Sequence, residues 1–555
     1  MNKKVCSFPI LFALLALLIG TCAVVFPASA QAAPTSTGSI TVSGTVASSY
    51  DAYQIFSANV VDGDSDAKIA TDLAWASDAV RDAALPVLHS AGMPNSQTAA
   101  QEAAEWLNTD SHLTSALSAQ LARSLQSSGA EPVALNAGTA AELPCGYWLI
   151  VARDDAIAQG EAGTAPIMAL VGGSAVTVKP KAATPKVAKH VLEDSTAAWQ
   201  KAADATVADD LYWRLSATVP AGLTAYDTYT VRFVDTMSAG LDPSKVAASM
   251  RVYVAAGADG GFDAVSAGKD GRAGTEPAQG WTDITAQCAT KVAADGTFTV
   301  RTGDLIAALG GADAFTAGAR VVAVYNAPLN SACNHGIAKG NPNEVYLRYP
   351  RSPFADQSGD AGFTRTPSDD ACAYTWDLAL TKRGSDGDKP LAGAVLSIAD
   401  DRGRTLAADG TWDAEGKATV TTGEDGRVTV SGVDSGKLEV RELKAPKGYT
   451  AFEGTRSVTV KAEGLDVDQV AAAKPKLTIT AESPLRADSA DGSTGSLEAS
   501  LINTPTGTPP SITTGGFMPS TGDMAMYAAA AAAVAGAALI VVALLVKRGG
   551  GSHKE

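Results

Sequence analysis

The sequence predicts a mainly β protein, in which a mixed α+β domain is followed by tandem β-sandwiches and a C-terminal transmembrane helix. Apolar and polar residues alternate with a period of two, as over residues 211–219 and 228–234, which predicts half-buried strands. Alanine-rich helical spacing is found over residues 72–125, so the helices belong to the first domain. An uncharged run over residues 524–546 is long enough to cross a hydrocarbon core about 30 Å thick.

The first domain is expected to span residues 34–181. Strand patterns occupy its two ends, over 38–56 at the start and over 146–151 and 165–178 at the end. Because the helical spacing lies between these strands, we expect a sheet with a helical insertion.

Two β-sandwiches are expected next, over residues 186–351 and 374–504. Turn signals rich in glycine and aspartate recur between their short strands, which is typical of antiparallel sandwiches. One short helical interruption is expected at residues 305–314. We interpret the polar stretch 352–373 as a connector or an edge loop, and the Pro/Gly/Thr-rich stretch 505–517 as a linker.

The N-terminus has the pattern of a secretory signal peptide over residues 1–30. Lys3 and Lys4 precede an apolar run at 8–25, and Ala28-Ser29-Ala30 supplies the small residues of a cleavage site. The pattern predicts a secreted chain from which this segment is removed.

Four cysteines remain after the signal peptide: Cys145, Cys288, Cys333 and Cys372. Four cysteines allow three pairings. A disulfide between Cys288 and Cys333 is favoured, because both fall in one predicted domain. None of the four has the short spacing typical of metal ligands, so no metal site is expected.

Composition and charge exclude several classes of function. The 555-residue chain carries a net charge of -16, which argues against nucleic-acid binding, because that function needs a basic face. Only five histidines occur, and none lies in a G-x-S-x-G, H-E-x-x-H or paired-cysteine setting. No phosphate-binding loop of the Walker type is present. We therefore expect neither an enzyme nor a cofactor.

The tail combines three features in a fixed order. Lys547 and Arg548 follow the uncharged run at 524–546, and a Pro-x-Thr-Gly motif precedes it: Met518-Pro519-Ser520-Thr521-Gly522. Together they resemble the cell-wall sorting signal of Gram-positive surface proteins, with methionine at the position where that family usually has leucine. The resemblance implies that a sortase cuts between Thr521 and Gly522 and transfers the threonyl acyl group to an amine.

The third domain contains the motif E-x-x-A-P-x-G-Y at residues 442–449. A lysine, Lys382, lies near the start of the domain, and an asparagine, Asn503, lies at its end. This arrangement closely resembles a Cna-B-type domain with an immunoglobulin-like sandwich. The resemblance implies an intramolecular isopeptide bond between Lys382 and Asn503, with Glu442 as the proton shuttle.

The second domain repeats this arrangement with different flanking residues. Its opening strand contains Lys189, a mid-domain strand contains Asp235, and its closing strand contains Asn341 and Asn343. By resemblance to backbone pilins, Lys189 and Asn343 would form the bond with Asp235 as the acid. Asn341 is the alternative partner.

A lysine between the first two domains is the expected acceptor of the sortase reaction. Val-x-Val-x-Pro-Lys ends at Lys181 and resembles the pilin motif, although Lys179 replaces the usual aromatic residue. The motif implies that the Lys181 amine resolves the acyl-enzyme made from the next subunit, whereas the alternative is a solvated basic linker.

Taken together, the motifs resemble those of SpaA-type major pilins along nearly the whole mature chain. The resemblance implies the backbone subunit of a covalent, sortase-assembled pilus at the cell surface. Expected partners are further copies of the chain, a class C-type pilin sortase, a housekeeping sortase, accessory pilins, peptidoglycan and host surface ligands. A monomeric, wall-anchored adhesin is the alternative, and a surface carbohydrate hydrolase is a more distant one.

Overall fold

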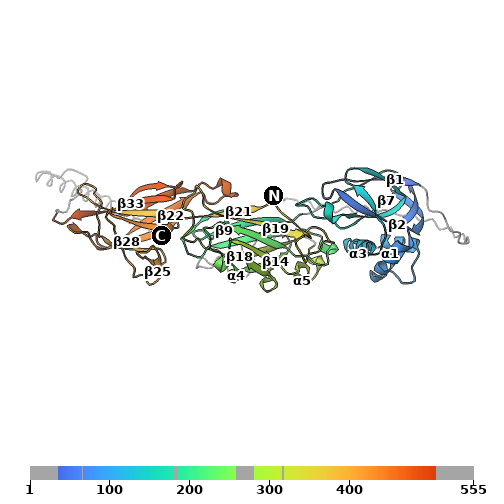
Figure 1. Cartoon of the computed structure of the whole chain (residues 1–555), viewed down its shortest axis with the longest axis horizontal. Coiled ribbons are helices and arrows are strands. Elements are labelled where there is room, and N and C mark those ends of the chain that lie inside the picture. The colour runs from blue at the N-terminus through green and yellow to red at the C-terminus, as the bar shows by residue number, and fades with distance from the viewer. Residues whose placement is uncertain are drawn as a thin grey trace, which may run out of the picture.

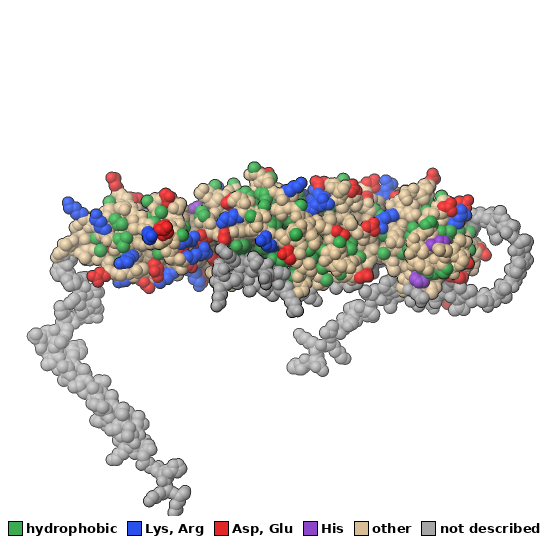
Figure 2. All heavy atoms as spheres, turned by 90° about the horizontal axis from the view of Figure 1, so that it is seen from below, with side chains coloured by type: hydrophobic (Ala, Val, Ile, Leu, Met, Phe, Trp, Pro, Cys, Tyr) green, Lys and Arg blue, Asp and Glu red, His purple; other side chains and the backbone are tan. Residues whose placement is uncertain are grey.

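The computed structural model describes residues 36–507, except 65–66, 110, 181–183, 258–279 and 316–317. Three folded parts follow one another along a rod, with the first part at one end and the third at the other (Figure 1). Most of the structure is β, with two sandwiches in the middle and third parts, so the predicted mainly β class is confirmed. On the face shown in Figure 2, positive and negative side chains are interspersed along the whole rod.

The first part contains two sheets. One has the order β5 (Ala140–Pro144), β1 (Thr37–Val42), β8 (Val176–Val178), and the other has the order β3 (Lys68–Trp75), β2 (Ser49–Asp62), β6 (Gly146–Ala152), β7 (Ile167–Val171), with β4 (Val133–Asn136) paired to β2. Its core contains buried apolar residues of the second sheet and of the helices, among them Phe56, Leu149, Leu88 and Leu121.

Three helices of the first part separate its strands: α1 (Asp78–Ser90), α2 (Ala100–Asn108) and α3 (Ser115–Ser127). Side-chain caps mark two of their starts, because Ser77 accepts from the Val80 N–H and Thr114 from the Leu117 N–H. The predicted sheet with a helical insertion is therefore present. Helix begins at Asp78, later than the spacing predicts, because residues up to Trp75 pair with β2.

The middle part is a sandwich of two sheets. The first sheet has the strand order β10 (Ala198–Gln200), β9 (Lys186–Glu193), β12 (Tyr212–Val219), β18 (Ala319–Asn326), β14 (Arg251–Ala256), β15 (Thr282–Asp283). The second sheet has the strand order β11 (Ala202–Asp204), β21 (Asp369–Tyr374), β19 (Asn341–Pro350), β13 (Arg232–Met237), β17 (Thr297–Arg301), β16 (Ala289–Val292). In this second sheet, β20 (Phe363–Arg365) also pairs with β19. Short helices α4 (Val246–Ser249) and α5 (Leu305–Ala308) lie between strands, the latter within the predicted interruption.

Residues 352–373 are more than the expected connector or edge loop. They contain β20 and β21, and both strands pair antiparallel with β19. The polar side chains of this stretch hid the strand pattern, because backbone pairing to a free edge of β19 needs little apolar alternation. After β21 only Thr375 precedes the first strand of the third part, so the chain passes almost directly from one sandwich into the next.

The third part is also a sandwich. One sheet has the order β27 (Arg427–Val433), β22 (Trp376–Gly384), β33 (Ser496–Pro505), β29 (Tyr449–Thr450), with β32 (Leu485–Asp491) on β33; the other has the order β25 (Trp412–Asp413), β24 (Thr405–Leu406), β23 (Val395–Ala399), β28 (Gly436–Lys444), β30 (Thr455–Glu463), β31 (Lys476–Ala481), with β26 (Val420–Thr421) on β23. The first and last strands, β22 and β33, are parallel neighbours.

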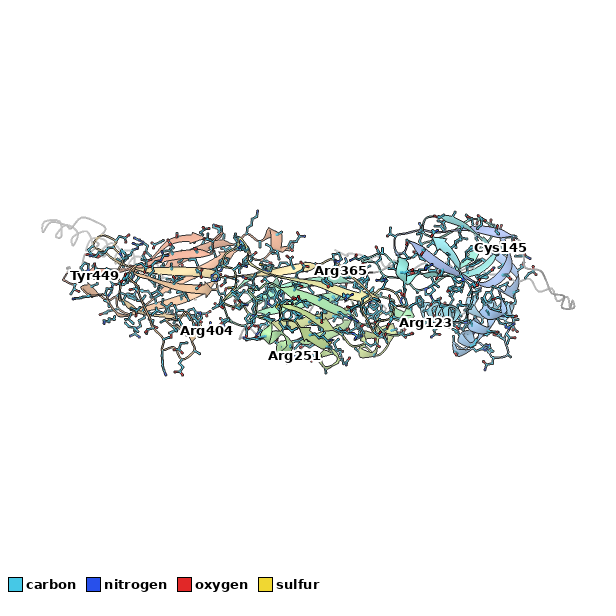
Figure 3. The ribbon with its side chains drawn as sticks, in the orientation of Figure 1. Arg123, Cys145, Arg251, Arg365, Arg404 and Tyr449 are labelled. Carbon is cyan, nitrogen blue, oxygen red and sulfur yellow. The ribbon has the colours of Figure 1, made fainter. Side chains whose placement is uncertain are left out.

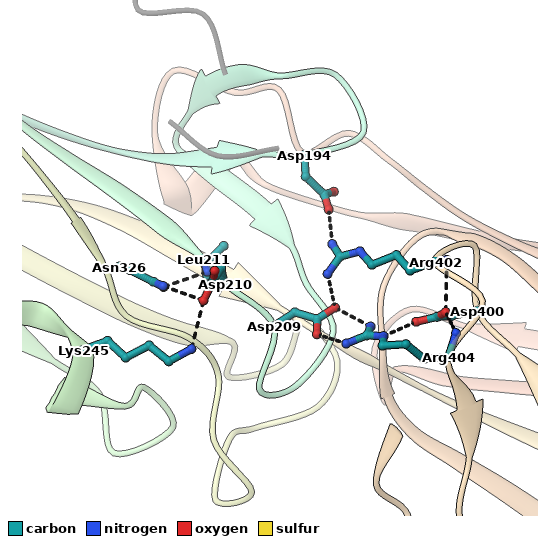
Figure 4. Close-up of polar contacts among 9 residues, drawn as sticks. All are labelled: Asp194, Asp209, Asp210, Leu211, Lys245, Asn326, Asp400, Arg402 and Arg404. Atoms are coloured by element: carbon teal, nitrogen blue, oxygen red, sulfur yellow. Dashed lines mark hydrogen bonds and ion pairs between the residues drawn. The ribbon is translucent and has the colours of Figure 1, made fainter. Parts of the chain in front are cut away.

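Polar contacts join the middle and third parts. Asp204 accepts from the indole N–H of Trp376 at 2.6 Å and from the Ser435 backbone N–H at 2.9 Å. Asp209 pairs with Arg402 at 2.9 Å and with Arg404 at 2.5 Å (Figure 4). Partly buried pairs of this kind have defined geometry, so they hold the two sandwiches in one orientation.

The first and middle parts are joined by fewer contacts. Arg123 of α3 forms an ion pair with Asp227 at 3.2 Å, and its guanidinium lies 5.5 Å from the ring centre of Phe354. The Tyr349 hydroxyl donates to the Gly160 carbonyl at 2.7 Å.

The cysteine pairing expected from the sequence is wrong. Cys145, Cys288, Cys333 and Cys372 are all free thiols. Cys288 lies beside the Ile284 carbonyl, whereas Cys333 lies 3.6 Å from the His335 ring, so the two favoured partners are on separate elements of the middle part. Membership of one sandwich did not bring their sulfur atoms together.

Among the residues that the structure describes, no helix is long and apolar enough to cross a membrane. The expected signal peptide, the sorting signal and the helix expected at 524–546 lie outside the described residues.

Gly146 provides a test of the first part. Its φ is +142°, and a Cβ at this position would lie 2.0 Å from the Phe56 carbonyl oxygen. We expect Gly146→Ala to lower the free energy of unfolding of the first part by about 3 kcal/mol, because the paired backbone must move. Gly138→Ala is the matched control, since its φ is +73° but its Cβ would meet nothing within 4 Å; it should cost only about 1 kcal/mol. Equal losses measured by calorimetry would contradict this account.

Candidate functional site

Lys189, Asp235 and Asn343 meet between the two sheets of the middle part. Lys189 comes from β9 in one sheet, and the other two residues come from β13 and β19 in the facing sheet. Asn343 is opposite Met237, two residues after Asp235, so the side chains of Asp235 and Asn343 point to the same face. All three residues are 0% exposed. The structure thus brings together the three residues that the sequence assigns to this domain.

Tyr325 of β18 connects these residues into one network, which we call the Lys189 cluster. The Lys189 ammonium pairs with Asp235 Oδ2 and donates to the Tyr325 hydroxyl at 2.9 Å. That hydroxyl donates to Asp235 Oδ2 at 3.1 Å and accepts from Asn343 Nδ2 at 2.8 Å. Asp235 Oδ1 and Asn343 Oδ1 are buried without a hydrogen-bond partner among the described residues.

Burial shifts both ionisable groups of the Lys189 cluster toward their neutral forms. It lowers the pKa of Lys189 to about 8, although the charge of Asp235 opposes the shift. It raises the pKa of Asp235, and there the charge of Lys189 opposes it. Transfer of a proton from the ammonium to the carboxylate is therefore easier than in water, and it yields a neutral amine beside a carboxylic acid.

Asn341, the alternative partner of Lys189, has a different role. Its Oδ1 accepts from the Asn334 N–H at 2.8 Å, and its Nδ2 donates to the Asn334 carbonyl at 2.9 Å. Because its amide is engaged by backbone groups of a neighbouring turn, this residue organises that turn. Asn343 is the asparagine in contact with the Lys189 network.

The Lys382 cluster of the third part comprises Lys382, Glu442 and Asn503. Lys382 and Asn503 come from the parallel neighbours β22 and β33, where Lys382 is opposite Leu501 and Asn503 is two residues further along. Glu442 reaches them from β28 in the facing sheet. The side chains of Lys382 and Glu442 are 0% exposed.

The contacts of the Lys382 cluster orient the amide of Asn503. The Lys382 ammonium donates to Asn503 Oδ1 and lies 3.1 Å from Glu442 Oε1. Asn503 Nδ2 donates to the same Oε1 at 2.9 Å, and the Phe452 N–H donates to Oε2 at 3.1 Å. The amide nitrogen thus faces the acid, and the amide oxygen faces the amine. Burial lowers the pKa of Lys382 to about 8, with the charge of Glu442 opposing.

Tyr325 is the participant that the sequence did not reveal. It lies in a nearly continuous apolar strand, and no motif surrounds it. The available signal was a tyrosine in an otherwise apolar strand, because a buried tyrosine hydroxyl needs a polar partner.

The two residues expected to join subunits, Lys181 and Thr521, lie outside the described residues, as do the other residues of the sorting signal. The neighbouring Lys179 is exposed and directly follows β8, which pairs in parallel with β1.

Comparisons with known proteins relate the third part to a family. Residues 377–474, which include Lys382 and Glu442, match the family described as "SpaA: Prealbumin-like fold domain". A stretch of 143 residues is 30% identical to the trypsin-resistant surface T6 protein of Streptococcus pyogenes serotype M6. The chain is related to the SpaA-type backbone pilins. The T6 alignment spans 24% of each protein, about a quarter of the length of this relative.

Solved structures of pilins show an extended but loose similarity to this chain. The T6 backbone pilin of Streptococcus pyogenes is 17% identical, with 85% of this chain and 98% of that chain covered and a TM-score of 0.45. The major pilin SpaD of Corynebacterium diphtheriae is 14% identical, with the same coverage and a TM-score of 0.40. Scores of this size are too low to establish a shared arrangement of the whole chain.

The lowered pKa of Lys382 predicts a pH dependence of stability. Asn503→Ala removes the amide and leaves the buried amine. From about pH 8 to 10.5, the unfolded chain then binds more protons at Lys382 than the folded chain does, so the free energy of unfolding rises with pH. We expect a gain of about 1–2 kcal/mol between pH 8 and 9.5 and no change below pH 7.

The control for this measurement is the double variant Lys382→Met/Asn503→Ala, which lacks the titrating amine. Denaturant unfolding of both variants over the pH series isolates the contribution of Lys382. Parallel stability curves for the two variants would show that burial does not depress this pKa.

Proposed function

We propose that this chain is the backbone subunit of a covalent, sortase-assembled pilus, and that it forms two intramolecular Lys–Asn isopeptide bonds. The observation that carries the proposal is the presence of a buried lysine–acid–asparagine cluster in each of two consecutive sandwiches along a rod. Its relationship to SpaA-type pilins supports a role as a pilus subunit. Burying a charged lysine and a carboxylate costs folding free energy, because both groups lose their hydration. A reaction that consumes the buried lysine would explain why the chain contains two such clusters.

The proposed reaction in the Lys189 cluster exchanges one amide bond for another. The Lys189 ammonium passes a proton to Asp235, and the neutral amine attacks Cγ of Asn343. A C–N bond forms to Lys189 Nζ, and the bond from Cγ to Nδ2 breaks. Asp235 gives this proton to the departing Nδ2 and takes the second proton from Nζ, so ammonia leaves, Nζ becomes a neutral amide nitrogen and Asp235 ends protonated. Tyr325 holds the amine and the amide on one hydroxyl.

The same reaction in the Lys382 cluster uses Glu442. Its Oε1 lies within hydrogen-bonding distance of both the attacking amine and the leaving amide nitrogen. One oxygen is thus placed to take the proton from Lys382 and to give it to Asn503 Nδ2. The Phe452 N–H on the other oxygen keeps the carboxyl group in this orientation.

Both bonds would carry mechanical load. In the third part the chain enters through β22 and leaves through β33, and a Lys382–Asn503 bond would join these two strands directly. Tension would then pass from β22 to β33 through this bond, and the chain between the two residues, which are 121 positions apart, would carry no load. In the chain-entropy model, cross-linking a loop of this size also stabilises the fold by roughly 4–5 kcal/mol.

Polymerisation would use an amine between the first and middle parts and an acyl group beyond the third part. Thr521 would become the acyl donor after cleavage before Gly522, and Lys181 of a neighbour would be the acceptor amine. The new bond is again an amide, and the sortase thiol is released. Head-to-tail contacts that do not close into a ring produce an open filament. The subunits would lie outside the cell, with the last one joined to peptidoglycan by a housekeeping sortase.

The alternative is a monomeric, wall-anchored adhesin with the same internal bonds. It shares the clusters and the tail, and it differs in whether Lys181 is used. Binding of accessory pilins or of host surface ligands is compatible with both functions.

The intact mass of the secreted chain tests the internal bonds. Each bond releases one ammonia, so the measured mass should be lower than the sequence mass by two ammonia molecules. Asn343→Ala and Asn503→Ala should each abolish one of these losses, because each removes one leaving group. Asn341→Ala is the matched control and should keep both. An unshifted mass for the unmutated chain would refute the bonds.

Cell-wall extracts separated on denaturing gels test polymerisation. Lys181→Ala should remove the high-mass ladder and leave monomer, because the acceptor amine is lost. Lys179→Ala removes an exposed lysine two residues away and should leave the ladder intact. A ladder that survives Lys181→Ala would overturn the proposed linkage, and the absence of any ladder from the unmutated chain would favour the adhesin.

A further inference from the structure

A row of four arginines crosses the outer face of the second sheet of the middle part. Arg232 of β13 is directly opposite Arg301 of β17 on one side and Arg348 of β19 on the other. Arg348 is in turn directly opposite Arg365 of β20. The inner neighbours Phe233 and Leu347 are 0% exposed, so the arginines point away from the core and from the Lys189 cluster. We call this set the arginine row.

The arginine row is an unfavourable arrangement for the fold by itself. Like charges directly opposite on paired strands are destabilising, and this row contains three such pairs. The neighbouring charges of Arg301 and Arg348 act together with burial to lower the pKa of Arg232. Within the described part of the chain, the ion pairs of the row go to a single carboxylate, Asp360, which contacts Arg232 and Arg348.

Aromatic rings hold two of the guanidinium groups in place. Arg232 lies 4.1 Å from the ring centre of Phe363, and Arg365 lies 5.0 Å from that of Tyr346. Stacking of this kind fixes the plane of a guanidinium. The Arg232 guanidinium also donates to Asp360 and to the backbone carbonyls of Gln357 and Gly359. Arg365 is therefore the stacked arginine that remains open to an oxyanion. Arg365 is exposed in the middle part, on the side toward the first part (Figure 3).

A polar hollow of about 380 Å³ lies at the exposed end of the row, where the first and middle parts meet. Three guanidiniums line it, those of Arg348, Arg351 and Arg365. The lining also contains Gln159, Tyr346 and Thr364, whose side chains carry amide and hydroxyl groups. Its volume is in the range of pockets that hold small ligands.

We propose that the arginine row and this hollow bind an acidic polysaccharide. Adjacent strands are about 4.8 Å apart, so the four arginines are spaced over roughly 14 Å. Arg365 is exposed, whereas the side chains of Arg348 and Arg232 are 27% and 14% exposed. A polymer with carboxylate or sulfate groups at intervals matches this row, and the amide and hydroxyl groups of the hollow match its sugar hydroxyls. The site is locally basic in a chain whose net charge is -16, so it would attract an anion. Binding here does not depend on polymerisation or on the internal bonds.

Titration of the full chain with defined fragments tests this site. The probes are a heparin fragment, which is sulfated, a hyaluronan fragment, which is only carboxylated, a polyglutamate peptide and inorganic sulfate. We expect one or both of the glycans to bind, with an affinity that falls as salt increases. The two glycan probes show whether carboxylate alone is sufficient.

Arg365→Gln should weaken glycan binding about tenfold, because it removes one charged donor pair. Arg486→Gln on β32 makes the same change of net charge at an exposed site in the third part and should change affinity less than twofold. Unchanged thermal unfolding of both variants would show that they are folded. The proposal is overturned if neither glycan binds, if only inorganic sulfate binds, if polyglutamate binds as well as the glycans, or if both variants lose affinity equally.

Discussion

The burial of a lysine amine beside a carboxyl group and a carboxamide is the constraint on which the rest of this structure depends. Water is excluded from both clusters, so burial disfavours the charge on each lysine and brings its pKa to about 8. The sandwich supplies that environment, because two facing sheets bring a lysine from one strand against an acid from another. The covalent bond would instead join the strand of the lysine to the strand of the asparagine, β9 to β19 in the middle part and β22 to β33 in the third.

The positions of the lysine and asparagine strands decide which parts of the chain a bond between these residues would connect. In the third part the lysine and the asparagine lie on the first and last strands, which are parallel neighbours. In the middle part they lie on the opening strand β9 and the late strand β19, which belong to facing sheets. Between the middle and third parts, one residue separates β21 from β22. Asp204 and Asp209 form a hydrogen bond and an ion pair across this junction. If both proposed bonds form, a rod built in this way would transmit tension through a short covalent path.

The outer surface follows different rules from the interior. The arginine row lies on the same sheet as Asp235 and Asn343, but on its opposite face, since successive residues of a strand point to opposite sides. Repulsion among the four aligned arginines lowers the free energy of unfolding of that sheet, whereas the proposed bonds in the buried clusters would raise it. A surface array that costs stability in an acidic chain is best explained by a ligand that neutralises it.

The amino-acid sequence predicted the fold class and the helical insertion from local patterns. The lysine, acid and asparagine of each cluster followed from its resemblance to Cna-B-type domains and backbone pilins, with Asn341 left open as a partner of Lys189. Tertiary structure decided what depends on facing surfaces. Tyr325 joins the Lys189 cluster only because β18 lies in the sheet opposite Asp235, and Asn343 is separated from Asn341 only by the contacts that each side chain finds. Phe363–Arg365 and Asp369–Tyr374 form strands because β19 offers them a pairing partner, and Cys288 and Cys333 lie apart because they are on different elements. All of these contacts depend on how the strands pack in three dimensions, so local sequence patterns do not predict them.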